Sequence, residues 1–253
     1  MMFDLTGKRA LVTGSTRGLG RSIAEELGRA GARVVISSNE PDLCPAVAAE
    51  LAALGIDTLP IPCDVADDSD LTAMVTRIDE AWGGLDILVC NAGVNLHNGP
   101  SPTATDEIYD KIMRINLRGT FKLCNLVIPA MAARREGAVV LMASLSSLRG
   151  NRSFGVYSMT KAAIAAMARN LAVEWGPDNI RVNAISPGFI DTDLANQIKL
   201  DTPRFERRIM QTPLRRIGTP REVAGSVLYL VSEAGAFTTG INLVVDGGTL
   251  VSD

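Results

Sequence analysis

Short apolar segments alternate along this chain with longer segments in which apolar residues recur at helical spacing. The short segments are apolar throughout, which is typical of strands that are covered on both faces of a parallel sheet. They are residues 9–13, 34–37, 58–61, 87–90, 139–143, 182–185 and 242–245. The helical period is clear from Leu19 to Ala30, and it recurs in residues 41–54, 67–82, 107–134, 157–174 and 220–231.

This alternation runs through the whole chain without a linker or an internal repeat. It predicts one α/β domain over residues 1–253, a Rossmann-type doubly wound parallel sheet of seven strands with helices on both faces. Residues 187–219 are the exception, since they contain three prolines and little strand character. A loop of that length in a compact domain is usually functional, so we expect a substrate lid at about residues 189–214.

Composition narrows the class of protein. The chain is 47% hydrophobic and has a formal net charge of −3, without the basic surplus of a nucleic-acid-binding protein. The apolar stretch 223–232 is well short of the ~20 residues that cross a bilayer. The N-terminus lacks the order of a secretory signal, and the four cysteines form no CxxC pair. We therefore expect a cytoplasmic protein with buried thiols that binds neither nucleic acid nor membrane.

A glycine-rich turn follows the first predicted strand. Gly14, Gly18 and Gly20 surround Arg17, and a helix is expected to begin near Leu19. Such glycines let the backbone approach a pyrophosphate, while free N–H groups at the helix start point at it. A P-loop is excluded because its Gly-Lys-Ser/Thr ending is missing. A dinucleotide cradle, a methyltransferase and a turn that binds nothing remain open on this motif alone.

Tyr157 and Lys161 open an alanine-rich helix with a spacing of four. That spacing puts the phenol and the ammonium on one helical face, where the cation favours phenolate and brings the tyrosine pKa toward neutrality. Such a pair can act as a general acid and base. Taken alone, the pair favours a structural role in the helix.

Further motifs occur in a fixed order along the chain. Asn91-Ala92-Gly93 follows the fourth strand, Asn116 lies in the next helix, Ser144 precedes Tyr157 by thirteen residues, and Pro187-Gly188 follows the sixth strand. With the glycine turn and the Tyr/Lys pair, this order resembles the short-chain dehydrogenase/reductase family. The resemblance covers the chain from Lys8 to Gly248. Cys90 departs from it, because many members carry asparagine there, at a position that is mainly structural in the family.

The resemblance implies a catalytic tetrad of Asn116, Ser144, Tyr157 and Lys161. Tyr157 would exchange a proton with the substrate oxygen, and Lys161 would lower the phenol pKa and bond the nicotinamide ribose. Ser144 would hold the substrate oxygen, with Ser146 as the competing candidate. Asn116 would bend its helix and hold a water that leads protons from Lys161 to solvent, although a purely structural polar residue fits the sequence nearly as well.

The resemblance also implies cofactor contacts beyond the strand ends. Asp64-Val65 would meet the adenine, with a helix cap as the alternative, and Ile190 and Thr192 would meet the nicotinamide carboxamide. The full set of expected cofactor contacts is Gly14, Arg17, Gly18, Leu19, Gly20, Ser38, Asp64, Val65, Asn91, Ala92, Gly93, Tyr157, Lys161, Pro187, Ile190 and Thr192.

The form of the dinucleotide depends on the end of the second strand. NAD-preferring relatives carry an acid at about Ser38, and residues 34–39 contain none. Arg17 stands where NADP-preferring relatives often carry a basic residue, although it could equally face solvent, and Asn39 replaces a second arginine seen in many of them. We expect NADP(H), with NAD as the alternative.

Together these features predict an NAD(P)-dependent oxidoreductase that interconverts a ketone and a secondary alcohol, and we expect NADPH-dependent carbonyl reduction as its direction. A catalytically silent dinucleotide-binding regulator of the same fold is the alternative. Arg149 and Arg152 lie near the expected pocket mouth, where they either attract an acidic substrate or simply face solvent. The single histidine, His97, has no cysteine or second histidine nearby, so we assign no metal to it. The resemblance implies self-association, as a homotetramer or a dimer.

Overall fold

The computed structural model describes residues 1–192 and 200–252 of the chain. Its centre is a seven-stranded parallel sheet in the order β3-β2-β1-β4-β5-β6-β7, which confirms the predicted Rossmann-type doubly wound α/β fold. All seven strands coincide with the predicted apolar segments to within two residues at either end. Their bounds are β1 Arg9–Thr13, β2 Arg33–Ser37, β3 Thr58–Pro60, β4 Ile87–Cys90, β5 Gly137–Met142, β6 Ile180–Pro187 and β7 Asn242–Val245.

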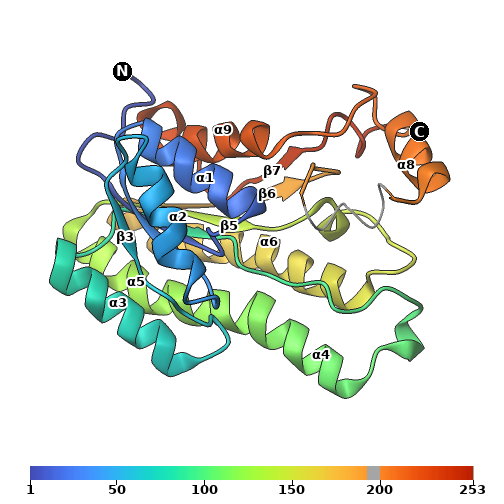
Figure 1. Ribbon diagram of the computed structural model, residues 1–253, viewed down its shortest axis with the longest axis horizontal. Coiled ribbons are helices and arrows are strands. Elements are labelled where there is room, and N and C mark those ends of the chain that lie inside the picture. The colour runs from blue at the N-terminus through green and yellow to red at the C-terminus, as the bar shows by residue number, and fades with distance from the viewer. Residues whose placement is uncertain (193–199, 253) are drawn as a thin grey trace.

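Helices cover both faces of this sheet (Figure 1). Side chains of α1, α2 and α9 pack on one face, and those of α3, α5 and α6 pack on the other. The helix bounds are α1 Gly18–Arg29, α2 Leu43–Ala52, α3 Asp68–Trp82, α4 Asp106–Met113, α5 Thr120–Arg134, α6 Gly155–Trp175, α8 Thr202–Met210 and α9 Pro220–Val231.

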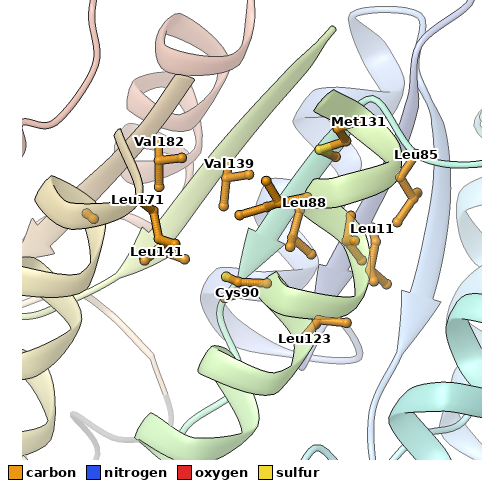
Figure 2. Close-up of a cluster of buried hydrophobic side chains, with 14 of the residues drawn as sticks. Leu11, Leu85, Leu88, Cys90, Leu123, Met131, Val139, Leu141, Leu171 and Val182 are labelled. Carbon is orange, nitrogen blue, oxygen red and sulfur yellow. The ribbon is translucent and has the colours of Figure 1, made fainter. Parts of the chain in front are cut away.

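Two hydrophobic clusters, one on each face, hold these layers together. Successive strand residues alternate between them, so that Leu11 enters one cluster while Val12 enters the other. Figure 2 shows the first cluster, in which strand residues such as Leu88 and Val139 meet Leu123 from α5. This two-sided burial explains why the strands are apolar throughout.

The predicted helix over residues 107–134 is continuous but irregular. It consists of α4, a π-helical stretch Arg114–Gly119 and α5, so Asn116 lies where the helix widens. A π-bulge inserts an extra residue per turn and is frequently found at functional sites. The structure thus has a π-helical stretch at Asn116, where the resemblance implies a bend.

The expectation of an irregular lid over residues 189–214 was incomplete. Residues 193–199 of it lie outside the described residues, but the remainder contains helix α8, which begins after the cap residue Asp201. The side chain of Asp201 accepts a hydrogen bond from the backbone N–H of Arg204 at 3.2 Å, with proline in the first turn. Figure 1 places α8 beside the C-terminal end of the chain. Within the described part of the chain, none of the helices has the length and apolar character that a membrane span requires.

Candidate active site

A cavity of about 660 Å³ lies beyond the carboxyl ends of the strands. It is bordered by the segments that follow β1, β4, β5 and β6, which are the positions where open α/β sheets bind ligands. Every residue expected to contact the cofactor lines this cavity, as do three members of the expected tetrad. The tetrad members that line it are Ser144, Tyr157 and Lys161, and the last two were also expected to contact the cofactor. The other cofactor contacts are Gly14, Arg17, Gly18, Leu19, Gly20, Ser38, Asp64, Val65, Asn91, Ala92, Gly93, Pro187, Ile190 and Thr192.

The glycine turn at the cavity wall needs glycine for two reasons. Gly14 and Gly18 have φ angles of +64° and +54°, which side chains of L-residues rarely adopt. A Cβ atom on Gly20 would lie 2.1 Å from the carbonyl oxygen of Gly14, so the helix α1 approaches the turn too closely for any side chain. The cap residue Arg17 makes no side-chain capping bond among the described residues, which leaves backbone N–H groups of α1 available to an anion.

Asn91 fixes the turn to the neighbouring strand. Its side-chain amide donates to the carbonyl oxygens of Thr13 at 2.9 Å and Gly14 at 3.1 Å. In return, the Thr13 hydroxyl oxygen accepts from the backbone N–H groups of Asn91 and Ala92, both at 3.0 Å. These four bonds lock the ends of β1 and β4 together, so the cavity floor is preorganised.

The structure adds an acid that the sequence analysis left out. Glu40 lies one position beyond the segment examined for a carboxylate; it lines the cavity and forms an ion pair with Arg17. The hydroxyl oxygen of Ser38 accepts a 3.1 Å bond from the backbone N–H of Glu40, which sets this turn. The group expected to bind a 2′-phosphate therefore already has an anionic partner. Reading one residue further along the sequence would have found it.

Asp64 and Val65 border the same cavity beyond β3. A carboxylate oxygen of Asp64 accepts a 2.9 Å bond from the N–H of Ala66, and its own N–H donates to Asp70 at 2.9 Å. The nearby helix α3 is capped by Asp67, which accepts bonds from the N–H groups of the first turn. The helix-cap alternative weighed for Asp64 thus belongs to Asp67.

Lys161 and Tyr157 project from the start of α6 into the cavity wall. The Lys161 ammonium is buried and donates a 2.7 Å hydrogen bond to the carbonyl oxygen of Met142, the last residue of β5. It lies 5.6 Å from the centroid of the Tyr157 ring. Just beyond β5, the Ser144 hydroxyl oxygen accepts two bonds from Ser146, from its N–H at 3.2 Å and its hydroxyl at 3.1 Å. Ser144 and Ser146 thus form a linked pair.

Burial is the largest influence on the pKa values of Lys161 and Tyr157. It lowers the pKa of Lys161 from 10.5 to about 8, with the nearby Cys90 acting weakly in the opposite direction. It also raises the pKa of Tyr157 above its ordinary value of 10.0, while a hydrogen bond with Ser144 acts to lower it. This direction is opposite to the lowering expected from the Tyr157–Lys161 spacing, because removal of the phenol from water is the largest influence on its pKa.

Asn116, the fourth expected tetrad residue, is buried behind the cavity wall. Its side-chain oxygen accepts a 2.8 Å bond from the N–H of Val94, and its amide donates to the Val94 carbonyl at 2.9 Å and to Thr160 at 3.2 Å. A Cβ atom on Gly93 would lie 3.3 Å from this oxygen and 3.4 Å from the Lys161 ammonium. Asn116 is therefore a neighbour of Lys161 that ties the π-helical stretch to the loop after β4.

The segment after β6 closes the cavity on its other side. Gly188 passes so near Asp246 that a Cβ atom would lie 2.5 Å from the aspartate Cβ. Ile190 pairs with Gly218 as an isolated bridge, and Thr192 lies over the glycine turn, since a Cβ on Gly18 would be 3.8 Å from its methyl group. Ile190 and Thr192 thus reach the cofactor end of the cavity from the opposite wall.

Three arginines line the cavity near this segment, namely Arg149, Arg204 and Arg208. The first was considered in the sequence, but the other two lie on α8, which the sequence analysis treated as an irregular lid. Arg152 does not border the cavity. His97 is buried outside it, with Nε2 bonded to the Thr103 hydroxyl at 2.8 Å.

These features were compared with known proteins. Residues 14–249 match a family model described as enoyl-(acyl carrier protein) reductase. The chain is 37% identical over 245 residues to the pig dehydrogenase/reductase SDR family member 4, covering 97% of this chain and 88% of that one.

Two solved structures share the fold over essentially the full length. A gluconate 5-dehydrogenase from Burkholderia cenocepacia in complex with NADP and tartrate has a TM-score of 0.96 and 30% identity, covering 100% of this chain and 98% of that chain. A putative 2-deoxy-D-gluconate 3-dehydrogenase from Agrobacterium tumefaciens with bound NADP has a TM-score of 0.92 and 32% identity, covering 99% of both. The chain therefore belongs to the short-chain dehydrogenase/reductase family and is an oxidoreductase that acts on CH–OH donors.

Proposed function

We propose that this protein is an NADPH-dependent carbonyl reductase that interconverts a ketone and a secondary alcohol, with Tyr157 as the general acid and base. One observation carries the proposal. Ser144, Tyr157 and Lys161 border the same cavity as the glycine turn that begins at Gly14, so a proton donor and a dinucleotide cradle share one space. A regulator that only bound the dinucleotide would need the cradle without the donor.

The residues present fit a nicotinamide dinucleotide. The cradle around Gly20 admits backbone but no side chain, and the first turn of α1 offers its N–H groups to a pyrophosphate. Asp64 and Val65 would hold the adenine end, while Asn91, Pro187, Ile190 and Thr192 would hold the nicotinamide end. When bound, the reduced nicotinamide supplies the hydride to the carbonyl carbon.

The remaining chemistry belongs to side chains of this chain. Ser146 donates its hydroxyl proton to Ser144, so Ser144 keeps its own hydroxyl proton, which interacts with Tyr157 in the free site and would donate to the substrate oxygen in the complex. Tyr157 gives its phenolic proton to that oxygen as the carbon accepts the hydride, and it takes the proton back in the reverse reaction. Burial raises the pKa of this phenol, so Tyr157 carries its proton in the free enzyme.

Lys161 returns a proton to Tyr157 in this proposal. Its pKa of about 8 places it close to neutrality, so it can release and regain a proton at physiological pH. Asn116 positions it from behind the wall. The water that the family resemblance assigns to Asn116 stays a prediction, since the three side-chain bonds of Asn116 go to Val94 and Thr160.

The preference for NADP over NAD rests on Arg17. A charge-assisted bond to a 2′-phosphate contributes about 1.5–3 kcal/mol, or about one to two decades in affinity. Glu40 opposes this, because its carboxylate pairs with Arg17 and would repel a phosphate. Both structural relatives described above contain NADP, which supports a 2′-phosphate. We infer that, when NADPH binds, its 2′-phosphate replaces the partly exposed Glu40 carboxylate as the ionic partner of Arg17.

We further propose that the protein is a cytoplasmic homotetramer, with a dimer as the alternative. Exposed apolar side chains on the helices α4, α5 and α6 support self-association, among them Tyr109, Phe121 and Val173. The four cysteines are buried and unpaired, which suits a reducing compartment. A monomeric mass by light scattering at micromolar concentration would contradict this assembly.

The test of the activity is an absorbance assay. NADPH consumption is followed against a panel of ketones that includes sugars, keto acids, β-ketoacyl thioesters, steroids and quinones, with the matching alcohols and NADP⁺ for the reverse reaction. Turnover of any member is the expected result. Tight cofactor binding without turnover of any member would instead favour the regulatory alternative.

A further inference from the structure

We propose that the substrate of this enzyme carries a carboxylate or another compact anionic group, and that Arg149, Arg204 and Arg208 bind it. This inference rests on the proposed reductase activity and names the substrate class of the same cavity. The three guanidinium groups come from two separate segments, the loop after β5 and the helix α8, and all three border the cavity. The sequence analysis placed Arg149 near the pocket mouth, but it did not single out Arg204 or Arg208.

The helix α8 presents its arginines unequally. Arg204 and Arg208 are four residues apart, half-buried, and line the cavity, whereas Arg207 is exposed and does not. The guanidinium carbon of Arg208 lies 5.9 Å from the ring centroid of Phe189, and the Phe205 ring packs edge-on against Phe189 at 5.9 Å. This aromatic pair holds α8 against the segment after β6. The two cations are therefore supported on a packed element and face the cavity.

Positive charge predominates at the end of the cavity that Arg149, Arg204 and Arg208 border. Among the described residues, the acids that border the cavity are Glu40 and Asp64. Both lie beyond β2 and β3, where the adenosine half of a dinucleotide is expected, and Glu40 is paired with Arg17. Within the described residues, no carboxylate forms an ion pair with Arg149, Arg204 or Arg208.

The positive charges of this cluster repel one another. Burial lowers the pKa of Arg208, and the neighbouring cations Arg149, Arg204 and Arg207 lower it further. Arginine nevertheless stays protonated in proteins, so this repulsion persists in the free enzyme. An anion placed between the guanidinium groups would remove it, and the planar fork of arginine suits carboxylate and phosphate oxygens.

The position of this cluster identifies the substrate rather than the cofactor. Arg149 lies in the loop after β5 that also carries Ser144, and Ser144 and Tyr157 hold and protonate the reacting oxygen in the same cavity in the proposed mechanism. The 2′-phosphate is assigned to Arg17, which lies in the turn between β1 and α1. The anionic group would therefore be a substituent of the ketone itself.

A set of matched ketones tests this. The 4-oxopentanoate and 5-oxohexanoate anions are compared with their methyl esters, and dihydroxyacetone phosphate is compared with dihydroxyacetone, which separates a carboxylate from a phosphate. We expect kcat/KM to favour the charged member of at least one pair by about tenfold or more, mostly through KM. Arg208→Gln and Arg204→Gln should each reduce that preference by about 10- to 100-fold and leave the neutral partner nearly unchanged.

Arg207→Gln is the matched control, because it removes the same charge from the same helix outside the cavity, and it should leave the preference intact. The anion site is overturned if Arg208→Gln lowers kcat/KM equally for charged and neutral ketones, or if the wild type prefers the charged member in no pair. Either result leaves the proposed reductase activity in place. If no ketone is reduced, the anion site is tested by binding alone. The melting temperature of the NADPH complex is measured with 4-oxopentanoate and with its methyl ester. Stabilisation that Arg208→Gln abolishes supports it, and its absence overturns it, whereas the missing turnover counts against the proposed function alone.

Discussion

The ammonium of Lys161 is anchored to the carbonyl oxygen of Met142, so a residue of α6 is fixed to the last residue of β5 by a 2.7 Å hydrogen bond. Ser144 follows Met142 by two positions, and Tyr157 lies one helical turn before Lys161. The three polar groups of the proposed mechanism therefore share one rigid junction between a strand and a helix. Catalytic groups built on such elements are positioned more precisely than groups on loops.

The first prediction concerns the phenol. Tyr157→Phe removes the proton donor without changing the ring, so it should reduce kcat by about 10²- to 10⁴-fold, as expected for loss of general acid catalysis. NADPH binding, measured by fluorescence titration, should persist. Tyr109→Phe is the control, because Tyr109 is an exposed tyrosine on α4. Undiminished turnover in the Tyr157 variant would refute the proposed mechanism.

The second prediction concerns the buried lysine. The pKa of Lys161 is about 8 in the folded protein against an ordinary value of 10.5, so between these pH values the unfolded chain binds the extra proton. The free energy of unfolding should therefore gain a contribution that rises with pH through this window, by at most about 1.4 kcal/mol per pH unit. Below about pH 8 both states are protonated and the contribution is constant.

Denaturant unfolding of the wild type and Lys161→Met across this pH range measures the effect. The difference between the two should change with pH in this window, with wild-type stability improving relative to the variant as pH increases. Lys111→Met, at an exposed position of α4, serves as the control. A difference that stays constant with pH would show that the folded and unfolded states hold this proton equally.

The third prediction concerns the close approach at the glycine turn. A methyl group on Gly20 would lie 2.1 Å from the carbonyl oxygen of Gly14, so Gly20→Ala must displace the turn or the helix. We expect a loss of about 1–3 kcal/mol in stability, the usual cost of overpacking, and loss of NADPH binding. Gly225→Ala, in α9, has nothing within 4 Å of its new methyl group and should be neutral or stabilising by up to about 1 kcal/mol. NADPH affinity that survives in the Gly20 variant would place the cofactor elsewhere.

The fourth prediction concerns the ion pair of Arg17 and Glu40. Arg17→Gln should weaken NADPH binding by about one to two decades and affect NADH little, because only NADPH carries the 2′-phosphate. Glu40→Gln should strengthen NADPH binding, since it removes a like charge beside that phosphate. Fluorescence titration with both cofactors measures each effect. Arg21→Gln, which breaks the neighbouring pair with Glu50, is the control, and equal weakening of both cofactors by Arg17→Gln would contradict the phosphate assignment.

Local sequence patterns predicted much of this structure. The seven strands were readable because burial on both faces leaves an unbroken apolar run, as in residues 87–90, and because each run ends where the chain must turn. The glycine turn was readable for a related reason, since Gly14 and Gly20 mark positions where a side chain cannot fit. The general position of the cavity then followed from the rule that parallel sheets bind ligands beyond their carboxyl ends.

Other features could be found only in three dimensions. Glu40 is one residue beyond the expected segment, and its importance comes from contact with Arg17, which is 23 positions away. The helix α8 was missed because the three prolines of residues 187–219 indicated a loop, whereas Pro203 lies in the first turn of α8, where proline is favoured. The pKa of Tyr157 was predicted in the wrong direction because spacing reveals a neighbouring cation but not the amount of water removed from the phenol.

The sequence by itself therefore determined the sheet, its two covered faces and the position of the glycine turn, because these depend on periodic burial and on backbone positions that exclude side chains. Tertiary structure alone decided which charges meet across the cavity, how far Lys161 and Tyr157 are desolvated, and that Arg204 and Arg208 of α8 join Arg149 at one end. Electrostatic energies depend on distance and solvent exposure, and neither quantity is a property of position along the chain.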